Sequence, residues 1–366
     1  MTSAIGGTGI IFEDDFNTNG PIDSTKWDYN RFENGGSFYG RTQQRQTLPS
    51  AQDGELQLRL DTFNPTGGPS FSTLLGSEAI TKQLFGPASG SGIAFEAKAR
   101  YAQDQAGIIG GFFTFAGPAN NHDEIDFELL SNDLSKIQTN IYHNEPLYEG
   151  HPISYPVTGS LQDSHVYRIE WLPNVVRWLV DGVVVRTERT LVPDKAMAMH
   201  LNIWGPPASW PTGSDSLVAA SSASQNQTFL YLVDYVKVEQ LAARVGSPLS
   251  EALVAGEGDH WLDGAKGHDT IRGGGGNDVL DGGAGDDWIT GGPGLDVLRG
   301  RAGNDVLITI DGVLGDVVEP GPGIDVVWVD EIDGVTDGLI GITTDDTVQA
   351  VAGFANGADR TLTGDR

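Results

Sequence analysis

The residues best suited to chemistry lie in one short stretch, HDEIDFELL, at positions 122–130. Apolar residues at positions 125, 127 and 129 alternate with carboxylates, and this period of two is typical of a half-buried β-strand. One strand face should therefore carry Glu124, Asp126 and Glu128. Fold stability does not require three like charges on one face, because they repel one another. Retaining hydrolysis of a glycosidic bond, in contrast, requires two carboxyl groups roughly 5 Å apart.

The spacing constrains how such a pair would work. Strand residues i and i+4 are about 13 Å apart along the backbone, at roughly 3.3 Å per residue. Glu124 and Glu128 would therefore have to lean toward each other over Asp126, with a sugar between them. The competing interpretation is a solvated acidic strand face without catalytic function.

The run HDEIDFELL, followed by KIQTNIY at 136–142, resembles the catalytic strand and its neighbour in glycoside hydrolase family 16. The resemblance covers roughly residues 10–240. It is strongest to the branch with an unbulged Glu-x-Asp-x-Glu strand, which includes lichenases, xyloglucan endotransglycosylases and bacterial exopolysaccharide glycanases. It implies that Glu124 is the nucleophile and that Glu128 is the general acid and base, with a raised pKa. Asp126 would share a proton or hydrogen bond with the nucleophile.

Further substrate contacts follow from the same resemblance. Gln138, Asn140 and Tyr142 share a period of two and would reach the sugar from the neighbouring strand, unless they form an ordinary polar sheet face. Trp204 and Trp210 match aromatic residues that stack on sugars, although a tryptophan is as often part of a core.

Other residues near this stretch have less specific roles. His122 should share the face of Glu124 and either orients a carboxylate or serves a structural role. Phe38, Tyr39 and Arg41 lie where related enzymes place a substrate loop.

Most of the first 240 residues read as short strands separated by turn residues, without a long stretch of helical periodicity. Asp181-Gly182, between two β-branched runs, predicts a hairpin. The predicted strands are 55–60, 92–101, 108–115, 124–130, 137–142, 166–172, 175–180, 183–187, 197–203 and 229–238. This pattern indicates an all-β sandwich. The resemblance specifies a concanavalin-like jelly roll of two antiparallel sheets with a substrate cleft on its concave face.

From residue 255 to 308 the sequence repeats every nine residues, as AGEGDHWLD, GAKGHDTIR, GGGGNDVLD, GGAGDDWIT, GGPGLDVLR and GRAGNDVLI. The fourth place is always Gly and the eighth is always aliphatic. The sixth place is His260 in the first repeat and then Asp269, Asp278, Asp287, Asp296 and Asp305. This pattern resembles the repeats-in-toxin nonapeptide, a parallel β-roll that binds calcium.

Calcium is the cofactor that these repeats predict. Turn carbonyls and Asp carboxylates are the hard oxygen ligands that Ca²⁺ prefers. Without the metal the Asp rows should repel one another and leave the roll largely unfolded. A flexible linker, the alternative, would show no strict period. A further calcium site on the jelly roll is predicted from Glu13 and Asp234, which could equally be two unrelated surface carboxylates.

Charge and composition restrict the partners. The formal net charge of −28 argues against nucleic acid and anionic membranes. Residues 241–366 are especially acidic, with 23 Asp and Glu against 7 Lys and Arg. The absence of cysteine excludes disulfides and cysteine-ligated metals. Without a run of 18 apolar residues, the sequence predicts no membrane span. We expect a monomer.

The sequence therefore predicts five segments: a loose terminus (1–9), the catalytic domain (10–240), a linker or short helical connection (241–254), the calcium-binding roll (255–330) and a C-terminal segment (331–366). The start MTSAIGG lacks a basic n-region and an apolar core, so it is not an ordinary secretory signal. In secreted proteins with this repeat, the extreme C-terminus usually carries the export signal. We therefore expect export information in residues 331–366, with a bacterial export machinery as partner.

The predicted function is that of a secreted, extracellular, retaining endo-β-glycanase. Its substrate would be a β-glucan-like polysaccharide, either mixed β-1,3-1,4-glucan or a bacterial exopolysaccharide such as succinoglycan. One alternative is a transglycosylase, although the xyloglucan branch has cysteines near its C-terminus and this chain has none. The other is a non-catalytic carbohydrate-binding matrix protein, which would have no use for three facing carboxylates.

Overall fold

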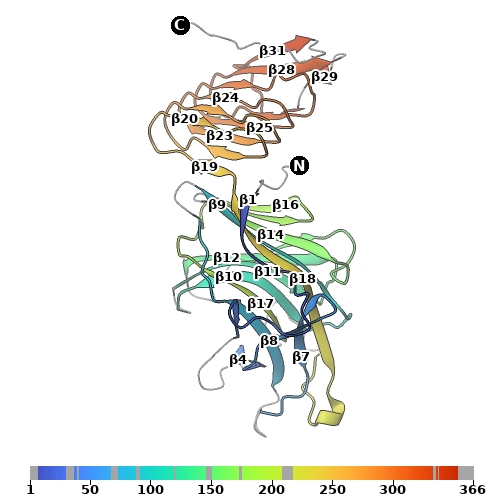
Figure 1. The fold of residues 1–366 in the computed structure, drawn as a ribbon. Coiled ribbons are helices and arrows are strands. Elements are labelled where there is room, and N and C mark those ends of the chain that lie inside the picture. Colours follow the sequence, from blue (N-terminus) through green and yellow to red (C-terminus); the bar gives the residue numbers. More distant parts are fainter. Residues whose placement is uncertain are drawn as a thin grey trace. The chain divides into compact units, whose positions relative to one another are not determined.

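The computed structural model describes residues 7–29, 37–38, 41–66, 73–87, 91–118, 121–145, 151–172, 175–207, 217–332, 335–336 and 338–352. Contacts divide the chain into two compact units. The sandwich unit comprises Gly9–Ala88 and Ile93–Gln240, and the roll unit is built mainly from the chain after Gln240. Strands dominate both units (Figure 1), and the described residues add one 3₁₀ turn, η1, at Ala223–Gln225.

One antiparallel layer of the sandwich unit carries the stretch 122–130. Its strands follow the order β13-β12-β11-β10-β17-β8-β3. Their bounds are β13 (Ile153–Pro156), β12 (Lys136–Glu145), β11 (His122–Leu130), β10 (Ile109–Ala116), β17 (Ala198–Trp204), β8 (Leu74–Thr81) and β3 (Trp27–Asp28). The predicted strands of this layer are confirmed, but the prediction missed β8.

The second layer follows the order β16-β15-β14-β9-β18-β7-β6-β2. Its bounds are β16 (Val183–Glu188), β15 (Val175–Val180), β14 (His165–Leu172), β9 (Gly92–Tyr101), β18 (Thr228–Leu241), β7 (Glu55–Asp61), β6 (Ser50–Gln52) and β2 (Gly20–Pro21). Strand β1 (Gly7–Asp14) pairs with β18, and β4 (Ser37–Phe38) pairs with β5 (Thr42–Gln44), which runs parallel to β8. The predicted hairpin is confirmed, because Asp181 and Gly182 have φ values of 50° and 79° between β15 and β16.

Large side chains fill the space between the two layers. Trp27, Phe112, Phe127 and Trp178 are fully buried in one hydrophobic cluster. The indole Nε1 of Trp178, on β15, donates a hydrogen bond to the main-chain oxygen of Asp126 at 2.9 Å. The core therefore contacts the backbone of β11 directly and fixes its position.

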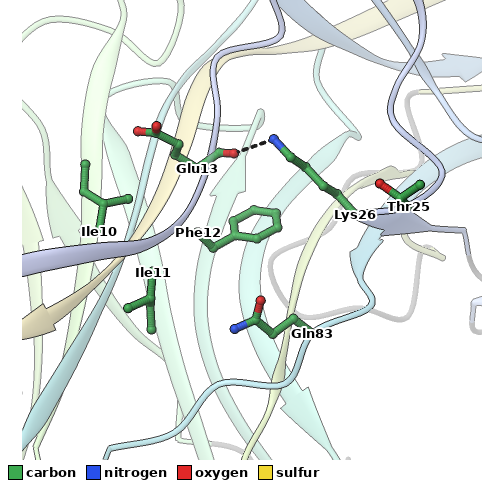
Figure 2. Close-up of a pocket in the computed structure, with 7 residues that line it drawn as sticks. All are labelled: Ile10, Ile11, Phe12, Glu13, Thr25, Lys26 and Gln83. Carbon is green, nitrogen blue, oxygen red and sulfur yellow. Dashed lines mark hydrogen bonds between the residues drawn. The ribbon is translucent and has the colours of Figure 1, made fainter.

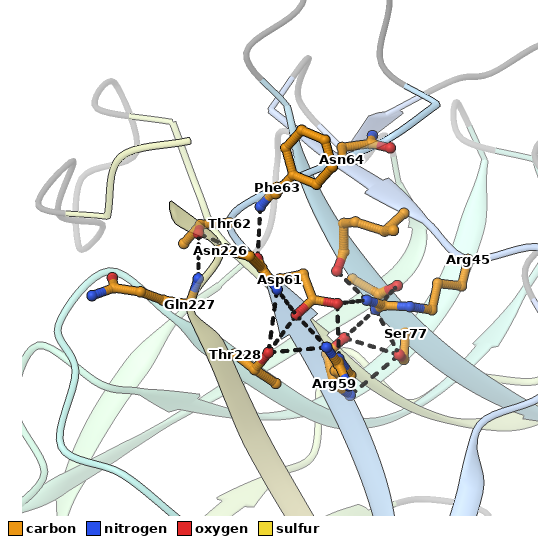
Figure 3. A network of polar contacts seen from close by, with 12 residues as sticks. Arg45, Arg59, Asp61, Thr62, Phe63, Asn64, Ser77, Asn226, Gln227 and Thr228 are labelled. Atoms are coloured by element: carbon orange, nitrogen blue, oxygen red, sulfur yellow. Dashed lines mark hydrogen bonds and ion pairs between the residues drawn. The ribbon is translucent and has the colours of Figure 1, made fainter. Parts of the chain in front are cut away.

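A polar network holds the ends of β5, β7, β8 and β18 together (Figure 3). Asp61 accepts hydrogen bonds from Arg59 Nε at 2.8 Å, Asn226 Nδ2 at 2.9 Å and Thr228 Oγ1 at 2.5 Å, and it pairs with Arg45. Burial raises the pKa of Asp61, but the hydrogen bonds from Arg59, Thr228 and Asn226 outweigh it and hold this pKa below its usual range. The ionised Asp61 therefore anchors the short strand β5 through Arg45.

The roll unit consists of two mostly parallel sheets (Figure 1). The first contains β19 (Ala243–Val245), β21 (Trp261–Asp263), β23 (Val279–Ala284), β25 (Val297–Ala302), β27 (Val317–Glu319) and β30 (Gly338–Leu339). The second contains β20 (Ala252–Val254), β22 (Thr270–Arg272), β24 (Trp288–Thr290), β26 (Val306–Ile308), β28 (Val326–Ile332), β29 (Val335–Thr336) and β31 (Thr347–Ala352).

One turn of the roll uses two nonapeptides. Trp261 pairs with Val279, and Val279 pairs with Val297, so partners are 18 residues apart. The aliphatic residues at the eighth place alternate between the sheets and are at most 1% exposed: Leu262, Ile271, Leu280, Ile289, Leu298 and Leu307. The parallel roll with an aliphatic core is therefore confirmed.

The prediction for residues 241–254 was wrong in its local structure. They form β19 and β20, which pair with β21 and β22, rather than a linker or a helical connection. Residues after 330 also continue the roll, because β31 pairs in parallel with β28. In the described part of the chain, no helix has the length and apolar character needed to cross a membrane.

Candidate active site

Strand β11 displays its carboxylates as the alternation predicted. Ile125, Phe127 and Leu129 are completely buried in the core. The register with β12 is continuous from Asp123 to Glu128, and its one shift lies before Asp123. The Glu-x-Asp-x-Glu strand is therefore unbulged. We call the side of the β13–β3 layer that bears Glu124, Asp126 and Glu128 the carboxylate face.

Strand β12 places a polar residue opposite each carboxylate. Tyr142 pairs with Glu124, Asn140 with Asp126 and Gln138 with Glu128. Gln138 Nε2 donates a hydrogen bond to Glu128 Oε2, and Asn140 Nδ2 donates one to the hydroxyl of Tyr142 at 3.1 Å. The three predicted substrate contacts thus lie directly beside the carboxylates.

Asp126 occupies the centre of this row and is 4% exposed. Burial raises its pKa well above the usual range, and the charges of Glu124 and Glu128 raise it further. The protonated form of Asp126 is therefore more strongly favoured than that of an ordinary aspartate, and its carboxyl group can form a hydrogen bond with the adjacent Glu124.

Glu128 has the electrostatics of a general acid. Burial raises the pKa of Glu128 to about 7, the hydrogen bond from Gln138 opposes this shift, and the charge of Glu124 adds to it. A carboxyl group with this pKa can both donate and accept a proton near neutral pH.

His122 lies against Glu124. Its Nε2 is 3.0 Å from Glu124 Oε2, and its ring is fully buried. The rings of Tyr142 and Phe115 lie 4.5 Å and 5.3 Å from it, centroid to centroid. The imidazole is therefore held in place where it can orient the carboxylate of Glu124.

The remaining predicted contacts are more distant or undescribed. Trp204, at the end of β17, is 6% exposed, so only a small part of its ring can meet a sugar. Arg41 Nη2 donates to the main-chain oxygen of Leu217. Trp210 and Tyr39 lie outside the described residues, and so does the side chain of Phe38.

The carboxylate face extends over strands that the sequence analysis did not connect with it. Asn202 on β17 pairs with Gly111 of β10, which in turn pairs with Glu128. Glu78 on β8 pairs with Asn202, and its Oε1 is 2.9 Å from His200 Nδ1. His200, Asn202 and Trp204 follow one another at a period of two, and this pattern could have predicted that they share a strand face. The sequence around Glu78 shows no such alternation.

A pocket of about 500 Å³ lies elsewhere on the sandwich unit (Figure 2). Its lining residues, none of which belongs to the carboxylate row, are Ile10, Ile11, Phe12, Glu13, Thr25, Lys26 and Gln83. The Lys26 ammonium donates to the main-chain oxygen of Glu13 at 2.8 Å. Asp234 pairs with Lys98 at 2.6 Å. The calcium site predicted from Glu13 and Asp234 stays a prediction.

Asp123, His143 and Asp194 bring ligand-type atoms within 4.8 Å of one another. The Asp123 carboxylate, however, already accepts main-chain N–H groups of Asn144, Asp194 and Lys195 at 2.8–3.2 Å. The Lys195 ammonium lies 3.2 Å from it. This carboxylate therefore anchors the end of β12 and the segment that precedes β17.

In the roll unit, each repeat aspartate has one carboxylate oxygen that accepts a hydrogen bond from a described residue and one that does not. In each, Oδ1 accepts a main-chain N–H from 18 residues earlier, for example from Asp278 to Asp296 at 2.8 Å. Their Oδ2 atoms are buried and have no hydrogen-bond partner within the described chain, in Asp269, Asp278, Asp287, Asp296 and Asp305. Burial raises the pKa of Asp278 and Asp287 to about 6 and that of Asp296 and Asp305 to about 7.

Glycine at the first place of every repeat after the first keeps the space beside Oδ2 open. A Cβ at Gly291 would lie 2.2 Å from Asp296 Oδ2, and one at Gly273 would lie 2.3 Å from Asp278 Oδ2. A buried, unpaired carboxylate oxygen beside a turn of main-chain carbonyls is a hard ligand set that suits Ca²⁺. The residues present therefore fit calcium.

Comparisons with known proteins agree with both units. The model of glycosyl hydrolases family 16 matches residues 36–222. The RTX calcium-binding nonapeptide repeat matches residues 245–280, 254–289 and 272–307, so the repeat region binds Ca²⁺.

Two relatives and one solved structure illustrate the similarity of the sandwich unit. The endo-1,3-1,4-β-glycanase ExoK of Rhizobium meliloti is 30% identical over 199 residues, which span 53% of this chain and 68% of that protein. The β-glucanase of Paenibacillus macerans is 36% identical over 100 residues, 27% of this chain and 42% of that protein. The crystal structure of a prokaryotic β-1,3-1,4-glucanase (lichenase) from a mouse hindgut metagenome has a TM-score of 0.50 and 28% identity, over 62% of this chain and 98% of that one.

The pKa of Glu128 leads to a pH prediction. If Glu128 donates a proton to the leaving group, kcat/KM should be lost as the pH rises through about 7, because the carboxyl group then ionises. Gln138→Leu removes the hydrogen bond that favours the ionised form, so the alkaline limb should move to higher pH. Gln52→Leu, at an exposed position of β6, is the control and should leave the profile unchanged. An alkaline limb that stays in place or moves lower in Gln138→Leu would contradict this role.

The unpaired Oδ2 atoms of the repeat aspartates lead to a prediction about the calcium dependence of folding. Asp296→Asn keeps an oxygen to accept the N–H of Asp278 but removes a buried charge. The calcium-free roll should therefore be as stable as wild type or more so, while half-maximal folding should need about tenfold more Ca²⁺, since ligand charge tunes affinity. Circular dichroism during calcium titration measures both. Asp286→Asn is the control, because its side chain is 54% exposed. Equal effects of the two substitutions would show that only net charge matters.

Proposed function

The chain belongs to glycosyl hydrolase family 16, and we propose that it is an endo-acting β-glucanase that retains anomeric configuration. The observation that carries the proposal is the unbulged row of Glu124, Asp126 and Glu128. Within this row, burial and the charges of the neighbouring carboxylates raise the pKa values of Asp126 and Glu128. Residues 10–240 form the catalytic domain, and the calcium-binding repeats at 255–308 belong to the roll unit that follows it.

The carboxylates divide the reaction between them. Glu124 attacks the anomeric carbon while Glu128 protonates the departing glycosidic oxygen, and a covalent glycosyl–enzyme forms. Glu128, now ionised, removes a proton from water, which attacks the anomeric carbon and releases Glu124. The carboxyl group of Asp126 and the imidazole of His122 hold Glu124 in position during both steps. Gln138, Asn140 and Tyr142 bind the sugar from β12.

The substrate proposal follows the relatives. Their names describe β-glucanases and an endo-1,3-1,4-β-glycanase, which supports mixed-linkage β-1,3-1,4-glucan for this chain. A bacterial exopolysaccharide such as succinoglycan is the second substrate class, and a panel of both polymers decides between them.

The roll unit suits an extracellular enzyme. Weak calcium sites, of about 10⁻⁴–10⁻³ M affinity, are empty in a cytoplasm and filled outside the cell. The buried aspartates would then keep the roll open during export, and calcium would close it after release. Proteins that carry this repeat are typically secreted, which supports an export signal in residues 331–366.

The catalytic proposal predicts the effects of three substitutions. Glu124→Gln and Glu128→Gln should each lower kcat on mixed-linkage β-glucan by about three orders of magnitude, because each removes a chemical role without a substitute. Asp126→Asn should cost less, because Asp126 acts through Glu124. Circular dichroism controls for folding. Near wild-type activity in either glutamate variant would refute the assignment.

The stereochemical part has its own measurement. Proton NMR of fresh product should show the β-anomer first, whereas an inverting enzyme would release the α-anomer. Reducing-end assays on lichenan, laminarin, xyloglucan, agarose and succinoglycan identify the polymer, and chromatography of the products separates hydrolysis from transglycosylation.

The export proposal predicts that a chain lacking residues 331–366 stays inside a secretion-competent bacterial host while its lysate retains glucanase activity. The full chain in the same host is the control and should reach the medium. Because β31 pairs with β28, folding of the truncated roll in calcium must be verified separately. Appearance of the truncated, folded protein in the medium without lysis would overturn this proposal.

A further inference from the structure

One outer face of the roll unit is used neither by the calcium sites nor by the catalytic mechanism. In β20, β22, β24 and β26 of the second roll sheet (Figure 1), the middle residue of three is buried in the aliphatic core, as Ile289 is. The residues on either side of it point outward, because successive side chains of a strand alternate. We call this surface the tryptophan face. It comprises the first and third residues of β20, β22, β24 and β26 together with their register partners in β28 and β31.

Two tryptophans belong to this face. Trp288, the first residue of β24, is 40% exposed. Trp328 is partly exposed on β28, two strands away, with Val306 and Ile308 of β26 between the two. From the register, the Cα atoms of the two tryptophans are separated by about 10 Å across the strands and about 7 Å along them. Two exposed indoles on one regular sheet face are typical of a binding surface.

The tryptophan face is neutral apart from one arginine, although the surrounding chain is strongly acidic. Residues 241–366 contain 23 Asp and Glu, yet none of them belongs to the face, and its charged side chain is Arg272. Asp330 continues the alternation of β28 beyond Trp328. It is 1% exposed, however, and accepts the main-chain N–H groups of Asp311 and Gly312 at 2.8 Å. The surface therefore offers no carboxylate to a partner.

The first roll sheet shows that this composition is not common to all surfaces of the roll. Its matching outward places include Asp281, Arg299 and Glu319. Arg299 Nε donates to Glu319 Oε2 at 2.9 Å, and Asp281 pairs with Arg301 at 2.7 Å. The charged side chains of that sheet pair with one another. The tryptophan face instead presents indole, hydroxyl and amide groups, the last from the exposed Gln349.

The chemistry of the face selects its occupant. Indole rings pack on the C–H faces of pyranose rings, and threonine and glutamine side chains exchange hydrogen bonds with sugar hydroxyls. Six strands span about 24 Å at about 4.8 Å per strand, which is long enough for several sugar units. An anionic polymer, or a second copy of this chain, would be repelled by the net charge of −28. A neutral polysaccharide is not repelled.

We propose that the tryptophan face binds a neutral β-glucan chain, with Trp288 and Trp328 stacked on sugar rings. The roll is then a polysaccharide-binding module that holds the enzyme on its polymer. The inference rests on the proposed β-glucanase function for the identity of the polymer. Because folding of the roll is coupled to calcium, binding by this face requires Ca²⁺.

The test measures binding in a background that does not cleave the polymer. Full-length Glu124→Gln, which lacks the proposed nucleophile, is run through native gels that contain soluble β-1,3-1,4-glucan at millimolar Ca²⁺. Adding Trp288→Thr or Trp328→Thr should weaken the affinity for the glucan about tenfold, because each removes a stacked ring. Leu295→Ala is the matched control. It shortens an apolar side chain that is 50% exposed in the segment before β25, and it should leave the affinity unchanged.

Threonine is chosen because the sheet already accepts it at matching outward places, Thr270 and Thr290. The double variant Trp288→Thr/Trp328→Thr in Ca²⁺ should bind no better than Glu124→Gln in EGTA, where the roll is open and only the carboxylate face remains to bind. Trp288→Tyr and Trp328→Tyr keep a ring that stacks and should retain most of the affinity. Circular dichroism during a calcium titration verifies the folding of each variant.

The contrary outcomes are distinct. Unchanged affinity in both threonine variants, or equal affinity of Glu124→Gln with and without Ca²⁺, would overturn the site. A dimer in Ca²⁺ that Trp288→Thr dissociates, with glucan affinity unchanged, would assign the face to a second copy of the chain. Stronger retardation by polygalacturonate, an anionic polymer, would contradict a neutral partner. Inactivity of the wild type on every β-glucan would refute the proposed function itself, which the binding assay does not measure.

Discussion

Carboxylates that are buried beside other carboxylates are the constraint on which both units of this protein depend. A charge in a protein interior interacts with its neighbours far more strongly than in water, so adjacent buried carboxylates cannot all stay ionised. In the sandwich unit, burial and repulsion raise the pKa of Asp126, and burial with the charge of Glu124 raises that of Glu128 to about 7, so both groups bind protons more readily than ordinary carboxylates. In the roll unit, burial and, to a smaller extent, neighbouring carboxylates raise the pKa of the repeat aspartates, and a divalent cation can take the place of the protons.

The groups around the carboxylates determine whether they are suited to binding protons or a metal ion. Glu128 receives a side-chain hydrogen bond from Gln138, and Glu124 has His122 beside it, so single protons can be positioned and moved within a fixed row. The repeat aspartates instead bind main-chain N–H groups through one oxygen and leave the other beside a glycine. That oxygen has no local proton partner, which favours a metal shared with the turn. One arrangement supports proton transfer, and the other couples folding to calcium.

Periodicity explains what could be predicted from the sequence. The alternation in β11 and the strict nine-residue repeat each specify which side chains are buried, and both were correct. The prediction missed strand β8 because its sequence LLGSEAIT does not alternate between apolar and polar residues. Its structure depends on pairing with β17. Residues 241–254 precede the regular repeat, so their pairing with β21 and β22 had no sequence pattern. The burial of Trp204 depends on packing between strands distant in the sequence.

An unpaired buried polar atom is not sufficient to indicate a binding site, as Tyr167 demonstrates. Its hydroxyl is buried without a hydrogen-bond partner in the described part of the chain, but its ring is part of the core between the layers. Burial of the aromatic ring offsets the cost of the unpaired hydroxyl. On the carboxylate face, in contrast, Asp126 and Asn202 each have a buried side-chain oxygen without a hydrogen-bond partner among the described residues. Unsatisfied groups on the sheet face that carries the catalytic carboxylates are what a surface built to bind hydroxyl groups should contain.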